Sequence, residues 1–274
     1  MESPLDPLSL VALVVLGTVT GFLAGLLGIG GGMIIVPFMS IVLDRVGFDR
    51  DLVLKLAIAT SLTTILFTSM SSVRAHHRRG AVRWDIVRTL APGIVAGSLA
   101  AAQVVRFMPS RWIALFFGAF IAWTATNMMR RKPRGAGELP ERGLPGGAGM
   151  FGAGGVIGAL SAFLGAGGGF LTVPFLAGRQ VRIHEAVATS AACGFPIALA
   201  GTIGYIVAGI GLDMPPYTIG FVYLPGLLAV ACASVLTAPL GARAAHALPV
   251  DTMRRIFACI LFGLSAYMFW RGLG

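Results

Sequence analysis

Charged residues are scarce in this sequence. Only 12% of its 274 residues are Asp, Glu, Lys or Arg, against about 25% in an average soluble domain, and 56% are hydrophobic. The mean hydropathy is +0.85. These values exclude a soluble domain and predict an all-α polytopic membrane protein. The net charge of +10 does not indicate nucleic-acid binding, because the basic residues lie in short loops between apolar runs, where they set membrane orientation.

Paired cysteines, metal ligands and charges at membrane depth are also missing. Cys193, Cys232 and Cys259 lie in apolar runs without CxxC or metal-ligand spacing, so we expect packing thiols and no metal site. The first residues include Glu2 and Asp6 in place of a basic n-region, so no cleaved signal peptide is expected. No charged residue lies in the middle of an apolar run, where a proton-relay transporter usually carries a carboxylate or histidine. We therefore expect no cofactor and no enzyme, since catalysis would need a nucleophile, an acid–base pair or metal ligands there.

The most informative pattern is a glycine-rich stretch that occurs twice. Residues 25–38 read GLLGIGGGMIIVPF and residues 162–175 read AFLGAGGGFLTVPF, and the two align without a gap at an offset of 137. Three consecutive glycines cannot sustain a good helix. In lipid, a broken helix is tolerated only where protein or a water-filled cavity covers its backbone. Two such breaks at matching positions in two halves indicate a transporter binding site.

The helix that begins after each glycine run is predicted to bind an anion. Its first amides lack intrahelical acceptors, its N-terminus carries a partial positive charge, and glycine lets a ligand approach the backbone. The alternative is close helix packing through small residues, for which Gly21-x-x-x-Gly25 and Gly154-x-x-x-Gly158 are typical. The residues predicted to bind substrate at the first tip are Gly28, Gly30, Gly31, Gly32 and Met33, and Pro37 is predicted to break the helix that follows. At the second tip the predicted binding residues are Gly165, Gly167, Gly168, Gly169 and Phe170, and Pro174 is predicted to break the following helix.

A second motif follows each glycine tip. The first half contains Ala-Thr-Ser at 59–61 and the second half contains the same three residues at 188–190. Each hydroxyl can donate a hydrogen bond to an oxyanion, so Thr60, Ser61, Thr189 and Ser190 are predicted to bind substrate. Interhelical or i−4 backbone hydrogen bonds, which are common for Ser and Thr in membrane helices, explain the motif equally well.

An internal duplication divides the chain into two repeats. Residues 130–148 form a polar linker rich in proline and glycine, which separates a first repeat, 1–129, from a second, 149–274. Each repeat is predicted to hold a glycine-broken hairpin and three full spans, at 52–73, 86–105 and 111–129, and at 184–210, 217–241 and 252–270. The pieces after the glycines, 33–43 and 169–178, are too short to cross comfortably and are predicted to be re-entrant.

The distribution of basic residues favours inverted topology for the two repeats. If each hairpin enters and leaves on one side, each repeat crosses an odd number of times, and 15 of the 21 Lys and Arg lie inside. If each hairpin crosses only once, the repeats are parallel, and the two sides of the membrane carry 11 and 10 of these basic residues. The positive-inside rule therefore favours inverted-topology repeats with the linker in the cytoplasm and both termini outside.

At the two glycine stretches and the Ala-Thr-Ser motifs the chain resembles the TauE/SafE family of membrane permeases, also called the sulfite exporter or toluene-sulfonate uptake permease family. The resemblance covers essentially the whole chain. It implies transport of a small sulfur-containing or organic anion, such as sulfite, thiosulfate or a sulfonate, across a prokaryotic cytoplasmic membrane.

We therefore predict a multi-pass secondary transporter of the cytoplasmic (inner) membrane, with a small anion and the lipid bilayer as partners. The particular anion, the direction of transport and the coupling are not decided by the sequence, and a homodimer is left open. A non-transporting accessory subunit and an integral membrane enzyme remain as alternatives. Measured flux in proteoliposomes separates the transporter from both.

Overall fold

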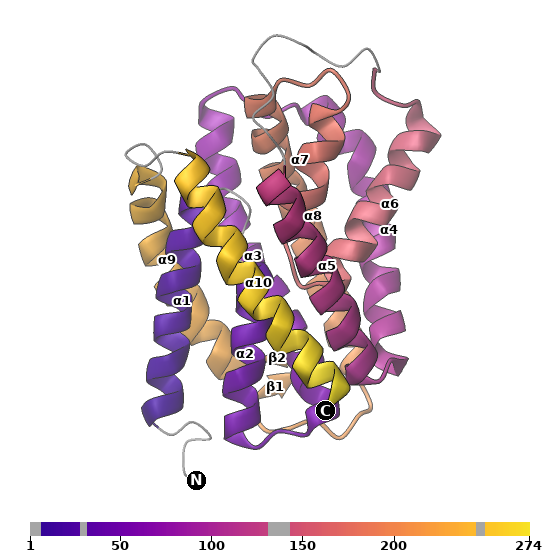
Figure 1. Cartoon of the computed structure of the whole chain (residues 1–274). Coiled ribbons are helices and arrows are strands. Elements are labelled where there is room, and N and C mark those ends of the chain that lie inside the picture. The colour runs from indigo at the N-terminus through magenta and orange to yellow at the C-terminus, as the bar shows by residue number, and fades with distance from the viewer. Residues whose placement is uncertain (1–6, 28–31, 131–142, 245–249) are drawn as a thin grey trace.

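The structure is a computed structural model, and it describes residues 7–27, 32–130, 143–244 and 250–274. Helices make up nearly all of this part of the chain (Figure 1). In chain order they are α1 (Pro7–Leu27), α2 (Gly32–Val46), α3 (Arg50–Arg78), α4 (Trp84–Phe107), α5 (Ser110–Arg130), α6 (Gly147–Phe163), α7 (Gly169–Ala177), α8 (Ile183–Gly209), α9 (Leu224–Ala244) and α10 (Val250–Leu273). The all-α class predicted from the sequence is confirmed.

Four helices, α3, α4, α5 and α8, are long and apolar enough to cross a membrane. These match four of the six predicted full spans. The described parts of the other two contribute shorter apolar stretches, Leu224–Thr237 and Phe257–Leu273. With 15 and nine residues, α2 and α7 are short, as the sequence predicted for the pieces that follow the glycines.

The predicted span 217–241 begins too early. Before α9 the chain forms a small antiparallel pair, β1 (Thr218–Ile219) with β2 (Val222–Tyr223). Gly220, at φ +55°, makes the turn between the strands, and its Cα packs against the end of α8 at Gly209. A Cβ on Gly209 would lie 2.5 Å from that Cα, so the turn can approach the helix only because both residues are glycine.

The helices of the two halves run in opposite senses. In Figure 1, α1 rises from the end where α10 terminates, α2 returns to that end, and α3, α4 and α5 cross alternately. The second half begins at the opposite end: α6 descends toward the middle, α7 returns, and α8, α9 and α10 cross alternately. Each glycine hairpin therefore enters and leaves at a single end of the molecule.

Helices from opposite halves pack closely through small residues. Gly158 of α6 allows contact with the backbone of α4, because a Cβ there would lie 2.2 Å from the carbonyl oxygen of Ile94. The Ser98 hydroxyl donates to the Gly158 carbonyl at 3.1 Å across the same interface. At the other flank α1 packs on α9, where the Ser234 hydroxyl donates to the carbonyl of Gly17 at 3.0 Å. Gly21, Gly154 and Gly158, three of the four glycines of the small-residue faces considered from the sequence, are thus used for helix packing.

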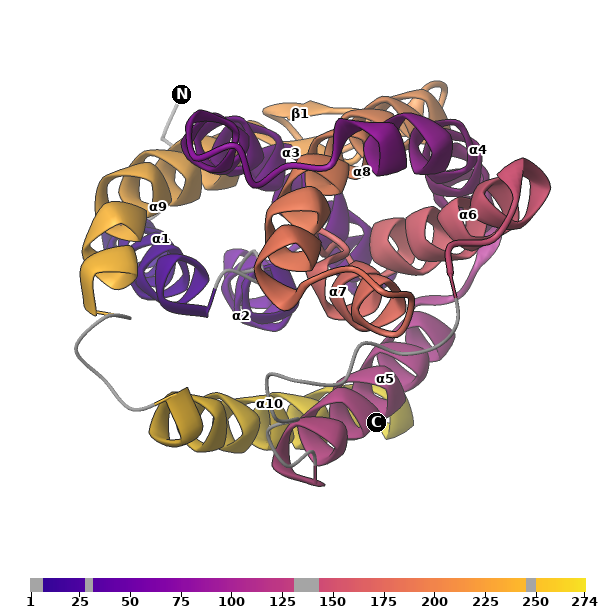
Figure 2. The same cartoon turned by 90° about the horizontal axis from the view of Figure 1, so that it is seen from above.

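Seen from above, the molecule has a clear layering (Figure 2). Helices α5 and α10 lie side by side in one layer, away from the remaining bundle. Within the bundle, α3 packs against α8 near the middle, with the α1–α9 pair at one flank and the α4–α6 pair at the other. The short helices α2 and α7 lie on the side of the bundle that faces the α5–α10 layer.

Candidate functional site

The second glycine tip touches the start of α2 in the core of the bundle. A Cβ on Gly32 would lie 2.3 Å from the carbonyl oxygen of Gly165 and 2.9 Å from the Cα of Ala166. On its other side, Gly165 packs on α3, where its Cβ would lie 3.1 Å from the Cα of Ile58. Sequence segments separated by more than a hundred residues therefore meet backbone to backbone, with no side chain between them.

The loop between α6 and α7 is a tight glycine turn. Gly165 and Gly168 have φ of +60° and +75°, which L side chains rarely adopt. The carbonyl of Gly168 accepts the amides of Leu171 and Thr172 at 3.0 and 2.9 Å, which leaves the two preceding amides as the free start of α7. The partial positive charge of this helix end is therefore buried in the core, and no acidic residue lies in its first turn.

The other predicted tip residues lie in the same region. Met33 is buried, Gly167 packs against the Ile65 side chain, and Gly169 opens α7. The Phe170 ring packs edge-on against Phe120 of α5 at 5.1 Å. Gly28, Gly30 and Gly31 lie outside the described residues. The predicted helix breakers, Pro37 and Pro174, lie inside α2 and α7.

Thr60 and Thr189 connect the two halves in equivalent ways. The Thr60 hydroxyl accepts the amide of Tyr223, the residue just before α9, at 3.0 Å. The Thr189 hydroxyl accepts the amide of Arg83, the residue just before α4, also at 3.0 Å. Each threonine thus satisfies a backbone donor at the start of a helix in the opposite half, a role close to that of a helix cap.

The two serines of the repeated motif differ. The Ser61 hydroxyl donates to the Gly165 carbonyl at 2.8 Å and ties α3 to the second glycine tip. The Ser190 hydroxyl is buried with no hydrogen-bond partner. Of the four predicted hydroxyls, Ser190 is therefore the one left without a partner.

Sequence reasoning missed two further hydroxyls beside the second tip. A Cβ on Gly168 would lie 3.0 Å from the Ser161 Oγ and 3.6 Å from the Thr172 Oγ1. Both residues are fully buried, and neither hydroxyl has a hydrogen-bond partner. A comparison of the two repeats for differences would have found them, because their counterparts at the offset of 137 are Ala24 and Ile35.

Buried charge is almost absent from the described residues. Lys55, near the start of α3, is the one charged residue in the buried class, and its Nζ donates to the Arg106 carbonyl at 3.0 Å. No cluster of three or more metal-ligating side chains occurs in the described part of the chain. Any anion held at the tips would therefore be bound by neutral donors and helix dipoles.

The comparisons with known proteins show the family of this chain. The family model described as Sulfite exporter TauE/SafE matches residues 13–268. This chain belongs to the TauE/SafE family. A probable membrane transporter protein of Haemophilus influenzae is 35% identical over 254 residues, which is 92% of this chain and 95% of that protein. A probable membrane transporter protein of Methanocaldococcus jannaschii is 27% identical over 95% of this chain and 96% of that protein. The probable membrane transporter protein YunE of Bacillus subtilis is 30% identical over 74% of this chain and 80% of that protein.

No solved structure matches this TauE/SafE chain significantly. Family membership and the names of the relatives both indicate a membrane transporter rather than an enzyme. Together with the apolar helices, they indicate a multi-pass membrane protein.

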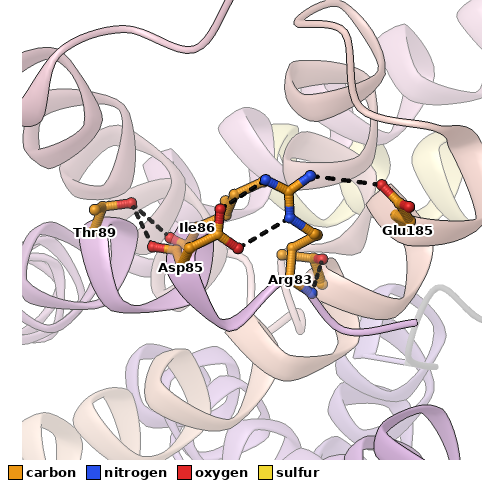
Figure 3. A network of polar contacts seen from close by, with 6 residues as sticks. Arg83, Asp85, Ile86, Thr89 and Glu185 are labelled. Atoms are coloured by element: carbon orange, nitrogen blue, oxygen red, sulfur yellow. Dashed lines mark hydrogen bonds and ion pairs between the residues drawn. The ribbon is translucent and has the colours of Figure 1, made fainter. Parts of the chain in front are cut away.

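One ionic network of this TauE/SafE protein lies where α4 and α8 begin (Figure 3). The Arg83 guanidinium donates to both Asp85 carboxylate oxygens, at 3.0 and 2.7 Å, and reaches Glu185 of α8 at 3.8 Å. These hydrogen bonds to Asp85 raise the pKa of Arg83, which therefore stays charged. Because Arg83 and Asp85 are largely exposed, the network contributes little to stability and serves mainly to position the two helix starts.

A second ion pair lies at the opposite end of the molecule. Arg271 of α10 pairs with Asp44 of α2, and the Arg271 guanidinium also donates to the Tyr267 hydroxyl at 3.5 Å. The Tyr267 hydroxyl lies 3.3 Å from the Ser40 Oγ. These contacts join α2 to the α5–α10 layer.

Proposed function

We propose that this protein is a secondary transporter that carries a small sulfur-containing or organic anion across the cytoplasmic membrane. The anion binds where the glycine tips meet, on backbone amides and hydroxyls. The observation that carries this proposal is the contact between Gly32 and Gly165 beside the free start of α7. Among the described residues the one buried cation is Lys55, whose Nζ donates to the Arg106 carbonyl. Sulfite, thiosulfate and sulfonates share the oxygen acceptors that such donors recognise.

The proposal includes two inverted-topology repeats, residues 1–129 and 149–274, joined by a cytoplasmic linker. It is supported by the opposite helix directions in Figure 1 and by the equivalent hydrogen bonds of Thr60 and Thr189. The pairing of α1 with α9 and of α6 with α4 has the same twofold pattern. Rocking of one repeat against the other around a fixed central site would give alternating access.

The lack of a buried carboxylate limits how transport can be driven. A charge that crosses the membrane gains or loses roughly 2.3 kcal/mol per 100 mV. Because no Asp or Glu of the described residues is buried, none of these carboxylates is available to carry a compensating proton through the core. We propose that the anion leaves the cell down its gradient and the membrane potential, or moves as a singly protonated form of a weak acid.

Flux in proteoliposomes tests the proposal. Purified protein is reconstituted and assayed with sulfite, thiosulfate, a sulfonate and a carboxylate, under valinomycin-clamped potentials at several pH values. We expect saturable flux of at least one sulfur oxyanion or sulfonate that responds to potential or to substrate protonation. Absence of flux for every anion, with correctly folded protein, would refute transport and favour the accessory subunit or the membrane enzyme.

A further inference from the structure

Three helices of the second half place buried hydroxyls without partners around one glycine turn. Ser161 comes from α6, Thr172 from α7 and Ser190 from α8, and each has at most 3% of its surface exposed. None of the three oxygens has a hydrogen-bond partner. A buried polar atom without a hydrogen-bond partner destabilises the folded state, so three in one helical half need a reason.

Two of the three hydroxyls lie beside the start of α7, and the third lies on a helix face that packs there. Ser161 and Thr172 face Gly168, as the distances of 3.0 and 3.6 Å from its absent Cβ indicate. Ser190 lies on the face of α8 that carries Gly194 four residues later, and a Cβ on Gly194 would lie 3.3 Å from the Gly167 carbonyl. This face of α8 therefore covers the glycine turn, and the amides that begin α7 point to the same place.

Helix back-bonding does not occupy these hydroxyls, although it does so elsewhere in the chain. Several buried Ser and Thr side chains donate to a carbonyl three or four residues earlier, namely Thr20, Ser40, Thr63, Thr64, Ser69 and Thr124. The same bond is the usual fate of such residues in membrane helices. Ser161, Thr172 and Ser190 do not make this bond, which leaves their donors free for another acceptor.

The first repeat does not contain this group of hydroxyls. Ala24 and Ile35 stand at the positions that correspond to Ser161 and Thr172, and the hydroxyl of Ser61, the counterpart of Ser190, is engaged by the Gly165 carbonyl. The asymmetry means that the two glycine tips cannot bind a ligand in equivalent ways.

We propose that the second tip alone forms an oxyanion site, in which Ser161, Thr172 and Ser190 donate to the ligand together with the first amides of α7. Its ligand is a small anion with three or more acceptor oxygens on one centre, either an inorganic sulfur oxyanion or the head of an organic sulfonate. Gly32, at the start of α2, packs against the turn that carries the site. This inference rests on the proposed function and assigns its substrate to one of the two tips.

The test compares three variants, Thr172→Val, Ser190→Ala and Ser161→Ala, with the control Ser61→Ala. Each site variant removes a donor that has no partner in the free protein, so the melting temperature without ligand should stay the same or rise. Loss of one hydrogen bond to a charged ligand should weaken binding about 10- to 100-fold, or about 1.4–2.8 kcal/mol. Ser61→Ala should behave oppositely, because it leaves the Gly165 carbonyl without a donor and should lower the melting temperature.

Two readouts are measured on the full chain in detergent and in proteoliposomes: the melting temperature with and without sulfite, thiosulfate, sulfoacetate or acetate, and the KM for flux. Thermal stabilisation by a sulfur oxyanion in the parent that is lost in Thr172→Val and Ser190→Ala supports the site. If sulfite alone stabilises, the ligand is inorganic; if sulfoacetate alone does, it is an organic sulfonate. If the parent transports and all three variants keep its KM, this site is refuted while the proposed transport function stands. If the parent shows neither flux nor thermal stabilisation, both the site and the transport function are refuted.

Discussion

Gly32→Ala tests the contact on which the proposed site depends. The new Cβ would lie 2.3 Å from the Gly165 carbonyl oxygen, so α2 and the second tip must separate by about 1 Å to reach ordinary van der Waals contact. The opposing atoms are backbone atoms in a tight turn and cannot rotate away. Overpacking of this kind costs about 1–3 kcal/mol, even though alanine favours helix over glycine by about 1 kcal/mol.

Gly152→Ala is the matched control. Gly152 lies in α6 with nothing within 4 Å of its absent Cβ, so the same chemical change adds helix propensity without a clash. We expect Gly32→Ala to lower the melting temperature in detergent and to reduce flux at least tenfold, while Gly152→Ala leaves both unchanged or slightly raises stability. Equal melting temperatures and equal flux for the two variants would show that Gly32 and Gly165 are not in contact in the working protein.

Three further predictions follow from charge and topology. Glu185→Gln should keep at least half of the flux and its pH dependence, because Glu185 meets Arg83 only at 3.8 Å; loss of proton-dependent flux with retained binding would instead make Glu185 the coupling group. Asp44→Asn should destabilise the protein by about 1.5–3 kcal/mol in thermal unfolding, and by more than Arg271→Gln does. The reason is that Asp44→Asn leaves the Arg271 charge without its partner, and only 11% of the Arg271 side chain is exposed against 32% of Asp44. A larger loss for Arg271→Gln would contradict the pairing. Cysteines at Arg78 and Asp213 should react with impermeant reagent from opposite faces of the membrane, and labelling from the same face would exclude inverted repeats.

The breaks in the helices could be predicted from sequence because they follow from local chemistry. Three glycines followed by an apolar run end one helix and begin another. Accordingly, α6 ends at Phe163 and α7 begins at Gly169. The strand pair before α9 could not be separated from the apolar span that follows it. Phe221 and Val222 are as apolar as a helix interior, but Phe221 lies in the turn and Val222 in β2, where Gly220 approaches Gly209.

The roles of the hydroxyls depend on contacts between the two halves. The hydrophobic periodicity of the sequence does not predict such contacts. Thr60 and Ser61 are adjacent, yet one accepts an amide before α9 and the other donates to the second tip. The repeated motif points to residues that both halves share, and several of them form hydrogen bonds between the halves. Ser161 and Thr172 differ from their counterparts Ala24 and Ile35, so similarity between the repeats does not point to them.

The pairing of α1 with α9 has a consequence for biosynthesis. Ser234 and the Gly17 carbonyl that it binds are 217 positions apart, so at about 5–20 residues per second α1 waits roughly 10–45 s for its main neighbour after it has left the ribosome. During that interval its small-residue face is covered only by lipid or by a chaperone of the insertion machinery. Slow or truncated synthesis would therefore leave an inserted first half whose glycine face is open to wrong partners, including the α1 of another nascent chain. Pulse-chase cross-linking from position 17 should first detect such outside contacts and later α9.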